Sequence, residues 1–185
     1  VAESGHRVAT PEAIRGSGLL PVSHVAWTDA LAYVRWLDGA LRDSEATPVQ
    51  IGELLRDGWR VDLPNEAQWE KAARGADGRI FPWGDAFAPG RANVPSSGPV
   101  AVGVTPCDDC AYGLSDMAGN VWEWTRSPYQ PYPFSEADDL STVATDALWI
   151  MRGGSFSDTE QHVRAANRGG ADPGARRPFI GFRIA

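Results

Sequence analysis

Tryptophan, glycine and proline are the residues that most constrain how this chain can fold. Its 185 residues include eight Trp, 20 Gly and 14 Pro. Glycine and proline favour turns, and large aromatic side chains stabilise a fold by burying much apolar surface. We therefore expect few long regular elements and much ordered loop, held in place by buried tryptophans.

Charge and apolar content weigh against several classes of protein. The formal net charge is −7, whereas nucleic acid and anionic lipid attract proteins with a basic face. The sequence also lacks a run of about 18 apolar residues, the length that a transmembrane helix needs. We expect neither nucleic-acid binding nor membrane insertion. The compartment stays open, and the lack of a leader-like start slightly favours the cytoplasm.

Apolar spacing predicts a first helix near the start of the chain. Leu31, Val34, Leu37 and Leu41 recur at helical intervals, which places them on one face. Thr28 lies just before this pattern and is expected to cap the helix.

Two shorter helices are predicted after it. The pair Thr47 and Pro48 is typical of a helix start, and Gly58 is placed to end that helix. Asn65 begins a near capping box for a third helix, which Gly75 is placed to end.

The rest of the chain favours strands and loops. Residues 79–133 show turns and short extended runs without a convincing helix, and residues 128–147 are typical of a long surface loop. Residues 148–152 and 179–184 are predicted as strands. The fold class expected is α+β, with two or three helices on a small, irregular antiparallel sheet and much ordered loop.

Six short strings, taken together, resemble one protein family. They are PVSHVAW (21–27), LPNEAQWEKAARG (63–75), FPWG (81–84), YGLSDMAGNVWEW (112–124), RGGS (152–155) and GFR (181–183). Their order and spacing resemble the formylglycine-generating enzyme (sulfatase-modifying factor) family. That resemblance implies a C-type-lectin-like fold, with residues 1–185 as a single domain. Fold alone does not give function, which depends on the site.

The cysteines that the family's enzymes use for oxidation are missing. The resemblance places that copper-binding pair shortly after RGGS, where this chain has Asp158 and Val163, and no cysteine follows Cys110. Thiolates are the natural ligands of Cu(I). We therefore expect no copper and no catalysis of that kind. His6, His24 and His162 lack the spacing of a metal site.

The same resemblance implies a structural calcium site. Its ligands would be Asp116 and Glu123 with the carbonyls of Gly119 and Val121, and hard oxygen ligands suit Ca²⁺. The alternative role of this stretch is packing, with Trp122 and its neighbour Trp124 as core anchors.

Cys107 and Cys110 have the spacing of a redox or metal motif. A zinc site needs about four ligands, and the sequence offers no second pair. A local disulfide, or two reduced thiols in a turn, is the interpretation that fits better.

The C-terminal segment, residues 152–185, resembles the variable region of diversity-generating retroelement proteins, which also have a C-type lectin fold. In those proteins, mutagenesis of Asn codons cannot produce Lys, Glu, Gln, Met or Trp, and the candidate positions here contain none of these. We expect this segment to bind a protein or another macromolecule. The candidate ligand-binding residues are Phe156, Ser157, Asp158, Thr159, His162, Gly169, Ala171, Ala175, Arg177, Pro178 and Phe179.

Three alternatives remain open at this stage. The chain could be an enzyme or accessory of the formylglycine-generating type with altered chemistry, in which Ser155, Asp158 and Arg164 line the old active-site region. It could be a structural interaction module whose activity lies in a missing N-terminal part. For Phe179, core packing beside Ile180 competes with a role as an interface anchor.

Overall fold

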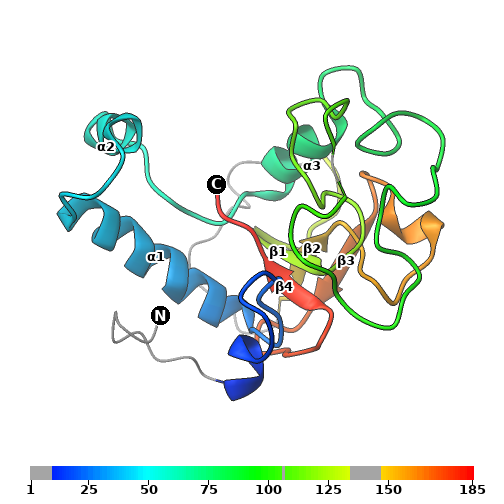
Figure 1. Cartoon of the computed structure of the whole chain (residues 1–185), viewed down its shortest axis with the longest axis horizontal. Helices are drawn as coiled ribbons and strands as arrows, with labels where there is room; N and C mark the ends of the chain where they lie inside the picture. The colour runs from blue at the N-terminus through cyan, green and yellow to red at the C-terminus, as the bar shows by residue number, and fades with distance from the viewer. Residues whose placement is uncertain (1–9, 106, 134–146) are drawn as a thin grey trace.

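The computed structural model describes residues 10–105, 107–133 and 147–185. In chain order, a 3₁₀ turn at Pro11–Ile14 precedes the helices α1 (Trp27–Asp43), α2 (Val49–Arg56) and α3 (Glu66–Arg74). The strands are β1 (Trp122–Pro128), β2 (Trp149–Arg152), β3 (Arg168–Ala171) and β4 (Ile180–Phe182), with a 3₁₀ turn, Glu160–Val163, between β2 and β3. Figure 1 shows the four strands gathered beside long stretches of loop.

The sheet is mixed, so the expected antiparallel sheet is wrong in one pairing. The strand order is β3-β2-β1-β4, and β1–β2 and β2–β3 are antiparallel. However, β4 runs parallel to β1, with Trp122 opposite Ile180. Residues 172–179 connect β3, at one edge of the sheet, to β4 at the other edge. Strands β3 and β4 run in the same direction. Two strands were expected, and they match β2 and β4. The strands β1 and β3 were not expected.

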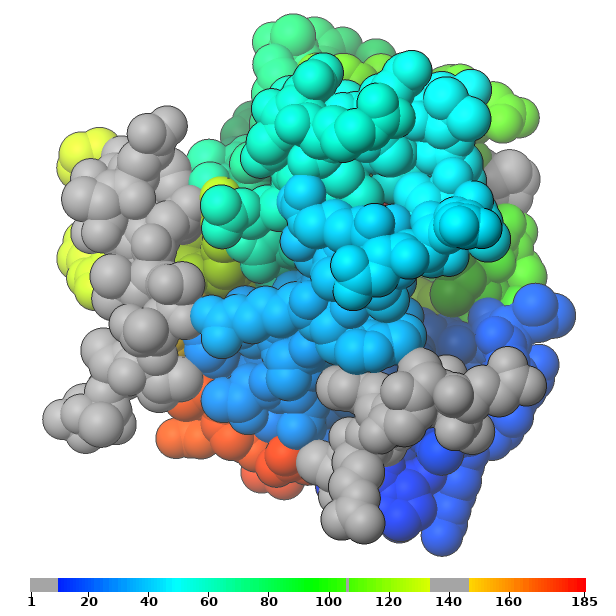
Figure 2. Space-filling view, turned by 90° about the vertical axis from the view of Figure 1, so that its left-hand side faces the viewer, coloured from blue at the N-terminus to red at the C-terminus, as the bar shows by residue number. Residues whose placement is uncertain are grey.

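Helix α1 begins one residue before its expected cap. The N-cap is Ala26, whose N–H donates to the Asp29 carboxylate at 2.9 Å, and Thr28 is exposed inside the first turn. Leu31 and Val34 of the expected stripe are buried. Figure 2 shows α1 and α2 together on one side of the molecule.

The other two helices differ in how well their starts were predicted. Helix α2 has Pro48, not Thr47, as its N-cap, because the Thr47 hydroxyl instead donates to the Leu41 carbonyl at 2.6 Å. Helix α3 has the predicted capping box between Asn65 and Gln68, with N···O distances of 2.7 and 2.8 Å. Gly75 ends it with a φ of 69°.

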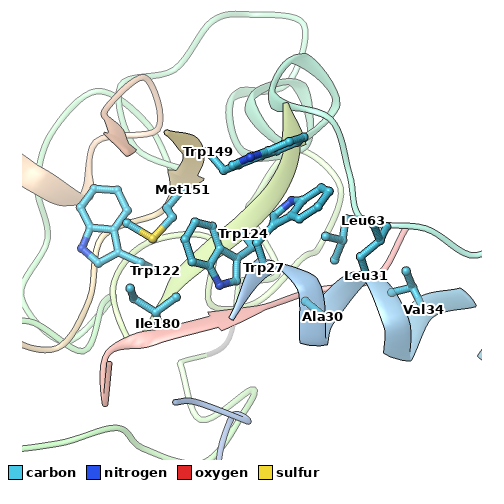
Figure 3. Packing of buried hydrophobic residues seen from close by; sticks show 10 residues of the cluster. All are labelled: Trp27, Ala30, Leu31, Val34, Leu63, Trp122, Trp124, Trp149, Met151 and Ile180. Atoms are coloured by element: carbon cyan, nitrogen blue, oxygen red, sulfur yellow. The ribbon is translucent and has the colours of Figure 1, made fainter. Parts of the chain in front are cut away.

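Tryptophans form the centre of the core, as expected. Trp27 stacks on Trp149 with ring centroids 3.8 Å apart, and Trp124 is wholly buried beside them (Figure 3). The indole N–H groups of Trp27 and Trp124 reach backbone carbonyls, as Trp27 donates to Thr125 at 2.8 Å and Trp124 donates to Val25 at 3.0 Å. The expected anchors Trp122 and Trp124 are confirmed as buried core residues, and Trp124 together with Trp27 ties the sheet to the start of α1.

Two expectations concern the outside of the fold. Most of the loop expected at 128–147 lies outside the described residues, and residues 129–133 are exposed. Among the residues that the structure describes, no helix combines the length and apolar character needed to cross a bilayer.

Candidate functional site

Trp122 connects three separate stretches of the C-terminal segment. Its backbone N–H donates to the Phe179 carbonyl at 2.8 Å. Its indole N–H donates to the Asp158 carboxylate at 2.9 Å. The face of its ring packs against the backbone of Gly169. One nearly buried residue of β1 thus fixes three of the candidate ligand-binding positions relative to one another, two through its side chain and one through its backbone.

Asp158 is held from several sides at once. Its carboxylate oxygen Oδ2 also accepts the Ser155 backbone N–H at 3.0 Å and the Ser155 hydroxyl at 2.6 Å. Such charge-assisted bonds are stronger than bonds between neutral groups. Asp158 therefore stabilises the turn after β2, which leaves little freedom for another residue type at this position.

Gly169 lies too close to the Trp122 ring to carry a side chain. A Cβ atom built on Gly169 would lie 2.9 Å from the nearest ring carbon of Trp122. Carbon atoms in contact normally lie about 3.5–4.0 Å apart. The glycine is therefore needed for the Trp122 ring of β1 to pack against the backbone of β3.

Six candidate positions present their side chains at or near the surface. Phe156 is half-buried on a fixed backbone, because its N–H donates to Asn120 at 2.9 Å and its carbonyl accepts from Ser96 at 2.7 Å. The Thr159 hydroxyl and the His162 Nδ1 atom are 3.1 Å apart. The exposed members are Ser157, Thr159, His162, Arg177 and Pro178.

The remaining three candidates pack inward. Ala171, Ala175 and Phe179 are partly buried against the tryptophan core. The half-buried Phe179 therefore contributes to core packing, and its remaining exposed part borders the surface.

The crossing segment between β3 and β4 is anchored to the start of α1. Trp27 donates its backbone N–H to the Pro173 carbonyl at 2.9 Å. Arg176 forms two hydrogen bonds with Asp29, at 3.1 and 3.0 Å. Arg176 was not a predicted site residue, and its partner lies too far away in the sequence for spacing to indicate it.

Of the four positions expected to bind calcium, Glu123 and Asp116 have protein partners for their carboxylates. Both carboxylate oxygens of Glu123 accept hydrogen bonds from Arg183, at 2.5 and 2.7 Å. The indole N–H of Trp69 donates to the same carboxylate at 2.6 Å. A divalent cation would compete with this guanidinium for the same oxygens. Asp116 accepts instead from the Gly103 N–H at 2.7 Å and from Thr105 at 3.0 Å.

Arg183 provides the positive charge beside Glu123, where the calcium ion was expected. Burial lowers the pKa of its guanidinium, but the charge of Glu123, their hydrogen bonds and the charge of Asp116 outweigh burial and raise the pKa overall. Gly119 has a φ of 77°, and a Cβ there would lie 2.9 Å from the Asn93 carbonyl oxygen. These residues therefore fit an internal ion pair and a close backbone approach.

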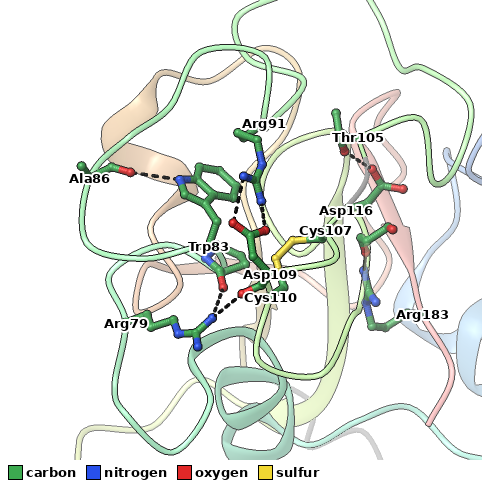
Figure 4. The surroundings of a disulfide bond; sticks show 12 residues. Arg79, Trp83, Ala86, Arg91, Thr105, Cys107, Asp109, Cys110, Asp116 and Arg183 are labelled. Carbon is green, nitrogen blue, oxygen red and sulfur yellow. Dashed lines mark hydrogen bonds and ion pairs between the residues drawn. A yellow bond between two sulfur atoms is a disulfide. The ribbon is translucent and has the colours of Figure 1, made fainter.

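Cys107 and Cys110 form a disulfide, which agrees with the expected local pairing. Cys107, Asp109 and Cys110 have possible ligand atoms close together, yet Asp109 is paired with Arg91 (Figure 4). That ion pair lowers the pKa of Asp109, chiefly through the hydrogen bond from Arg91. Arg91 also lies over the Trp83 ring, 5.3 Å from its centroid. The cluster fixes a surface loop.

A buried ionic network supports β2 and β3, and the sequence analysis missed it. Arg152 is wholly buried and contacts Glu70, while it donates to the carbonyls of residues 166 and 167 at 3.0 and 2.8 Å. Arg168 forms two bonds with Glu66, at 2.5 and 2.8 Å. The arginine of RGGS and the glutamates of EAQWE could have suggested it, because buried charges need partners.

The residues of the enzyme alternative come together only in part. Ser155 and Asp158 share a hydrogen bond, but Ser155 is wholly buried and its hydroxyl also lies 3.0 Å from that of Ser157. Arg164 is exposed and donates to the Gln161 carbonyl. Val163, at the second expected cysteine position, is wholly buried.

Known proteins resemble the chain over nearly its whole length. A family model described as a sulfatase-modifying factor enzyme 1-like domain matches residues 3–185. The mouse (Mus musculus) protein named inactive C-alpha-formylglycine-generating enzyme 2 is 34% identical in an alignment of 193 positions that covers 92% of this chain and 52% of that protein. The formylglycine-generating enzyme of Streptomyces coelicolor is 32% identical in an alignment of 185 positions that covers 89% of this chain and 52% of the enzyme.

A solved structure shares the fold. Treponema denticola variable protein 1 matches with a TM-score of 0.70 and 25% identity, over 95% of this chain and 74% of that one. This match and the family model confirm the expected α+β, C-type-lectin-like fold. The chain spans about half the length of the curated relatives it matches.

Proposed function

The chain belongs to the family of sulfatase-modifying factor enzyme 1-like domains, and within that family we propose that it is a non-catalytic domain that binds a protein partner. Its binding surface consists of solvent-facing side chains in the stretches that Trp122 holds together. As in the variable proteins of diversity-generating retroelements, this surface can be diversified. The members of the surface are Phe156, Ser157, Thr159, His162, Arg177 and Pro178, with the exposed part of Phe179.

The lack of redox ligands supports a non-catalytic role. The positions of the expected cysteine pair are occupied by Asp158, which is bound by Trp122 and Ser155, and by the buried Val163. Neither residue offers a thiolate to copper. A relative 34% identical to the chain carries the word inactive in its name, whereas another relative is named as an enzyme.

The observation that carries the proposal is the way Trp122 holds three stretches at once. Asp158, Gly169 and Phe179 each contact Trp122 through a hydrogen bond or close packing. These three contacts fix the backbone beneath the surface, and none of them involves an exposed side chain. Rigid scaffolds that position variable loops in this way are typical of binding proteins.

A protein is the partner class that the surface residues favour. Arg177 is exposed, and Phe179 leaves part of its ring at the edge of the core. Arginine and aromatic residues are enriched where protein interfaces bind most strongly. The resemblance to a variable protein in fold agrees with this class of partner.

A pair of display libraries tests the proposal. The first randomises Ser157, Thr159, His162, Arg177 and Pro178, and the second randomises Trp122, Asp158 and Gly169. We expect most members of the first library to be displayed in folded form, and selection on unrelated proteins to yield binders. Members of the second library should be lost from display. Equal loss of both libraries would contradict the proposal.

The enzyme alternative is tested on the unaltered chain. Titration with Cu(I) and incubation with a cysteine-containing peptide should show neither stoichiometric copper binding nor peptide oxidation. Turnover of the peptide would replace the binding role by an altered formylglycine-generating chemistry.

A further inference from the structure

A mostly apolar cavity of about 410 Å³ lies between the loop that precedes α1, the first turns of α1, the start of β1 and the end of β4. Figure 1 shows that loop, in dark blue, beside β4 and the start of α1. The volume is within the range of about 300–1,000 Å³ that is usual for small-molecule sites. Among the described residues, the cavity lining and the proposed partner surface have no member in common. The cavity is therefore a second candidate site.

Regular spacing brings the lining side chains of α1 to one wall. Asp29, Ala32 and Tyr33 line the cavity, and residues three and four apart lie on the same face of a helix. Phe182, at the end of β4, lines it as well. The rings of Tyr33 and Phe182 meet edge to face, with centroids 5.6 Å apart. This wall thus offers aromatic surface to a ligand.

The opposite wall is fixed by hydrogen bonds within the protein. The Val102 N–H donates to the Leu19 carbonyl at 2.8 Å. The next N–H along the chain, that of Gly103, donates to the Asp116 carboxylate at 2.7 Å. The loop at residues 102–103 is thereby joined both to the loop before α1 and to Asp116. A cavity formed in advance loses less affinity to ordering when a ligand binds.

Apolar side chains converge on the mouth of the cavity. Ile14, Val22 and Val102 line it and are all exposed to solvent. Single exposed apolar residues are normal on a protein surface, whereas a group of them around one cavity indicates a binding site. The lining therefore favours a ligand with an apolar body.

The charged groups of the lining carry excess negative charge. Three carboxylates, those of Asp29, Asp116 and Glu123, face the single guanidinium of Arg183. Both oxygens of Glu123 accept from Arg183, so the charge of Arg183 is balanced inside the protein. Asp29 accepts from Arg176, which lies outside the lining. The excess charge is therefore that of Asp116.

Asp116 has capacity for a further hydrogen bond. It is partly exposed, and its two carboxylate oxygens accept from the Gly103 N–H and, at 3.0 Å, from the Thr105 hydroxyl (Figure 4). Both donors are neutral. An ionised carboxylate can accept about four hydrogen bonds. A positively charged donor on a ligand fits this position, whereas an anionic group would be repelled.

We propose that this cavity binds a small molecule that has an apolar body and one protonated amino group. The body packs against Tyr33, Phe182 and the exposed apolar side chains at the mouth. The ammonium group donates to the Asp116 carboxylate, and such charge-assisted hydrogen bonds are stronger than those between neutral groups. The site does not depend on the proposed partner surface.

Calorimetric titration of the full chain with three probes tests the charge of the ligand. Phenethylamine, phenethyl alcohol and phenylacetate share a phenyl ring and differ in charge, and EGTA is present throughout. The amine should bind several-fold more tightly than the alcohol, and the acid should bind most weakly. Absence of amine binding at millimolar concentration, or affinities that do not follow this order, would overturn the proposal.

Replacement of Asp116 tests the contact with the amino group. Asp116→Asn should weaken binding of the amine about tenfold and leave that of the alcohol unchanged. Asparagine tolerates the φ of 59° at this position, so the backbone is retained. Asp43→Asn is the matched control, because it removes the same charge from the exposed last residue of α1, at the opposite end of the helix from the cavity. Equal weakening by both variants would overturn the proposal.

Two further measurements test the apolar body and the metal alternative. Ala32 is exposed and lines the cavity, so Ala32→Phe should occupy it and abolish binding of amine and alcohol alike, with little change in the thermal midpoint. Retained binding in this variant would overturn the position of the site. Calcium in place of EGTA should leave the affinity for the amine unchanged. Loss of amine binding in calcium would assign Asp116 to a metal site instead.

Discussion

Replacement of Gly169 by alanine perturbs the contact on which the binding surface depends. Gly169 lies in β3 with its backbone against the Trp122 ring. A Cβ atom there would lie 2.9 Å from Cζ3, 3.1 Å from Cε3 and 3.2 Å from Cη2 of that ring. Because three ring atoms are affected together, a small rotation of Trp122 cannot relieve all of them. The ring is also held by its hydrogen bond to Asp158.

The cost follows from two opposing effects. Overpacking of a well-packed core costs about 1–3 kcal/mol. Alanine also restricts the unfolded chain more than glycine does, which returns about 0.5–1 kcal/mol. We therefore expect Gly169→Ala to lower the free energy of unfolding by about 1–2 kcal/mol. For a chain of this size, the midpoint of thermal unfolding should fall by about 2–8 °C.

Urea unfolding, followed by tryptophan fluorescence, measures the effect. Gly98→Ala is the control, because a Cβ there has no atom within 4 Å and the glycine does not need a positive φ. The control should change the urea midpoint little. The double variant Gly169→Ala with Trp122→Phe should recover part of the loss, because the smaller ring makes room. A Gly169→Ala protein at least as stable as the wild type would refute the reasoning and return Gly169 to the variable positions.

Three other perturbations test charged groups outside the binding surface. Glu66→Gln should destabilise the chain by about 3 kcal/mol in urea, because Arg168 and Arg152 then lose a buried counter-charge; a loss below about 1 kcal/mol would show that Glu70 suffices. The pKa of Asp38 is lowered by its hydrogen bond from Arg42, so this pair contributes stability above about pH 4 that is lost as the pH falls through the lowered pKa. Asp38→Asn should therefore make the fall in thermal midpoint between pH 5 and 3 shallower, and an unchanged slope would contradict the pairing. Addition of calcium or of EGTA should leave the thermal midpoint unchanged, because Glu123 is bound to Arg183; a clear rise with calcium would restore the metal site.

Local signals in the sequence were sufficient for the helices. The capping box of α3 depends on residues three apart, and it was predicted with its glycine end. The start of α1 was misplaced because a carboxylate, Asp29, caps the backbone of Ala26, which has no capping side chain itself. Trp122 and Trp124 were predicted as anchors because large aromatic residues in a compact motif are typically buried.

The strands β1 and β3 escaped prediction for physical reasons. Strand β1 is buried on both faces and yet carries Glu123, Thr125 and Ser127. These side chains are satisfied by distant groups, such as Arg183 for Glu123 and the Ile150 carbonyl for Thr125. Apolar and polar residues alternate only over Trp122–Thr125, and Arg126, Ser127 and Pro128 break the pattern, so the alternation is too short to mark the whole strand. Strand β3 is RGGA, in which glycines lower the strand signal.

The sequence predicted which segment holds the candidate site, but it did not predict how the residues of that segment are arranged in space. The sequence placed the variable positions in residues 152–185 but did not separate the exposed ones from those bound to Trp122. Asp158 and Gly169 lie far from Trp122 in the sequence, so their contacts with it depend on the sheet pairing.

Sequencing of the 3′ coding segment across a population of the source cells tests the binding account most directly. We predict that substitutions are concentrated in the codons of Ser157, Thr159, His162, Arg177 and Pro178. The codons of Trp122 and Gly169 should stay constant, and a near-copy of the segment and a reverse-transcriptase gene should lie nearby. An invariant segment without such a near-copy would contradict a diversified binding surface.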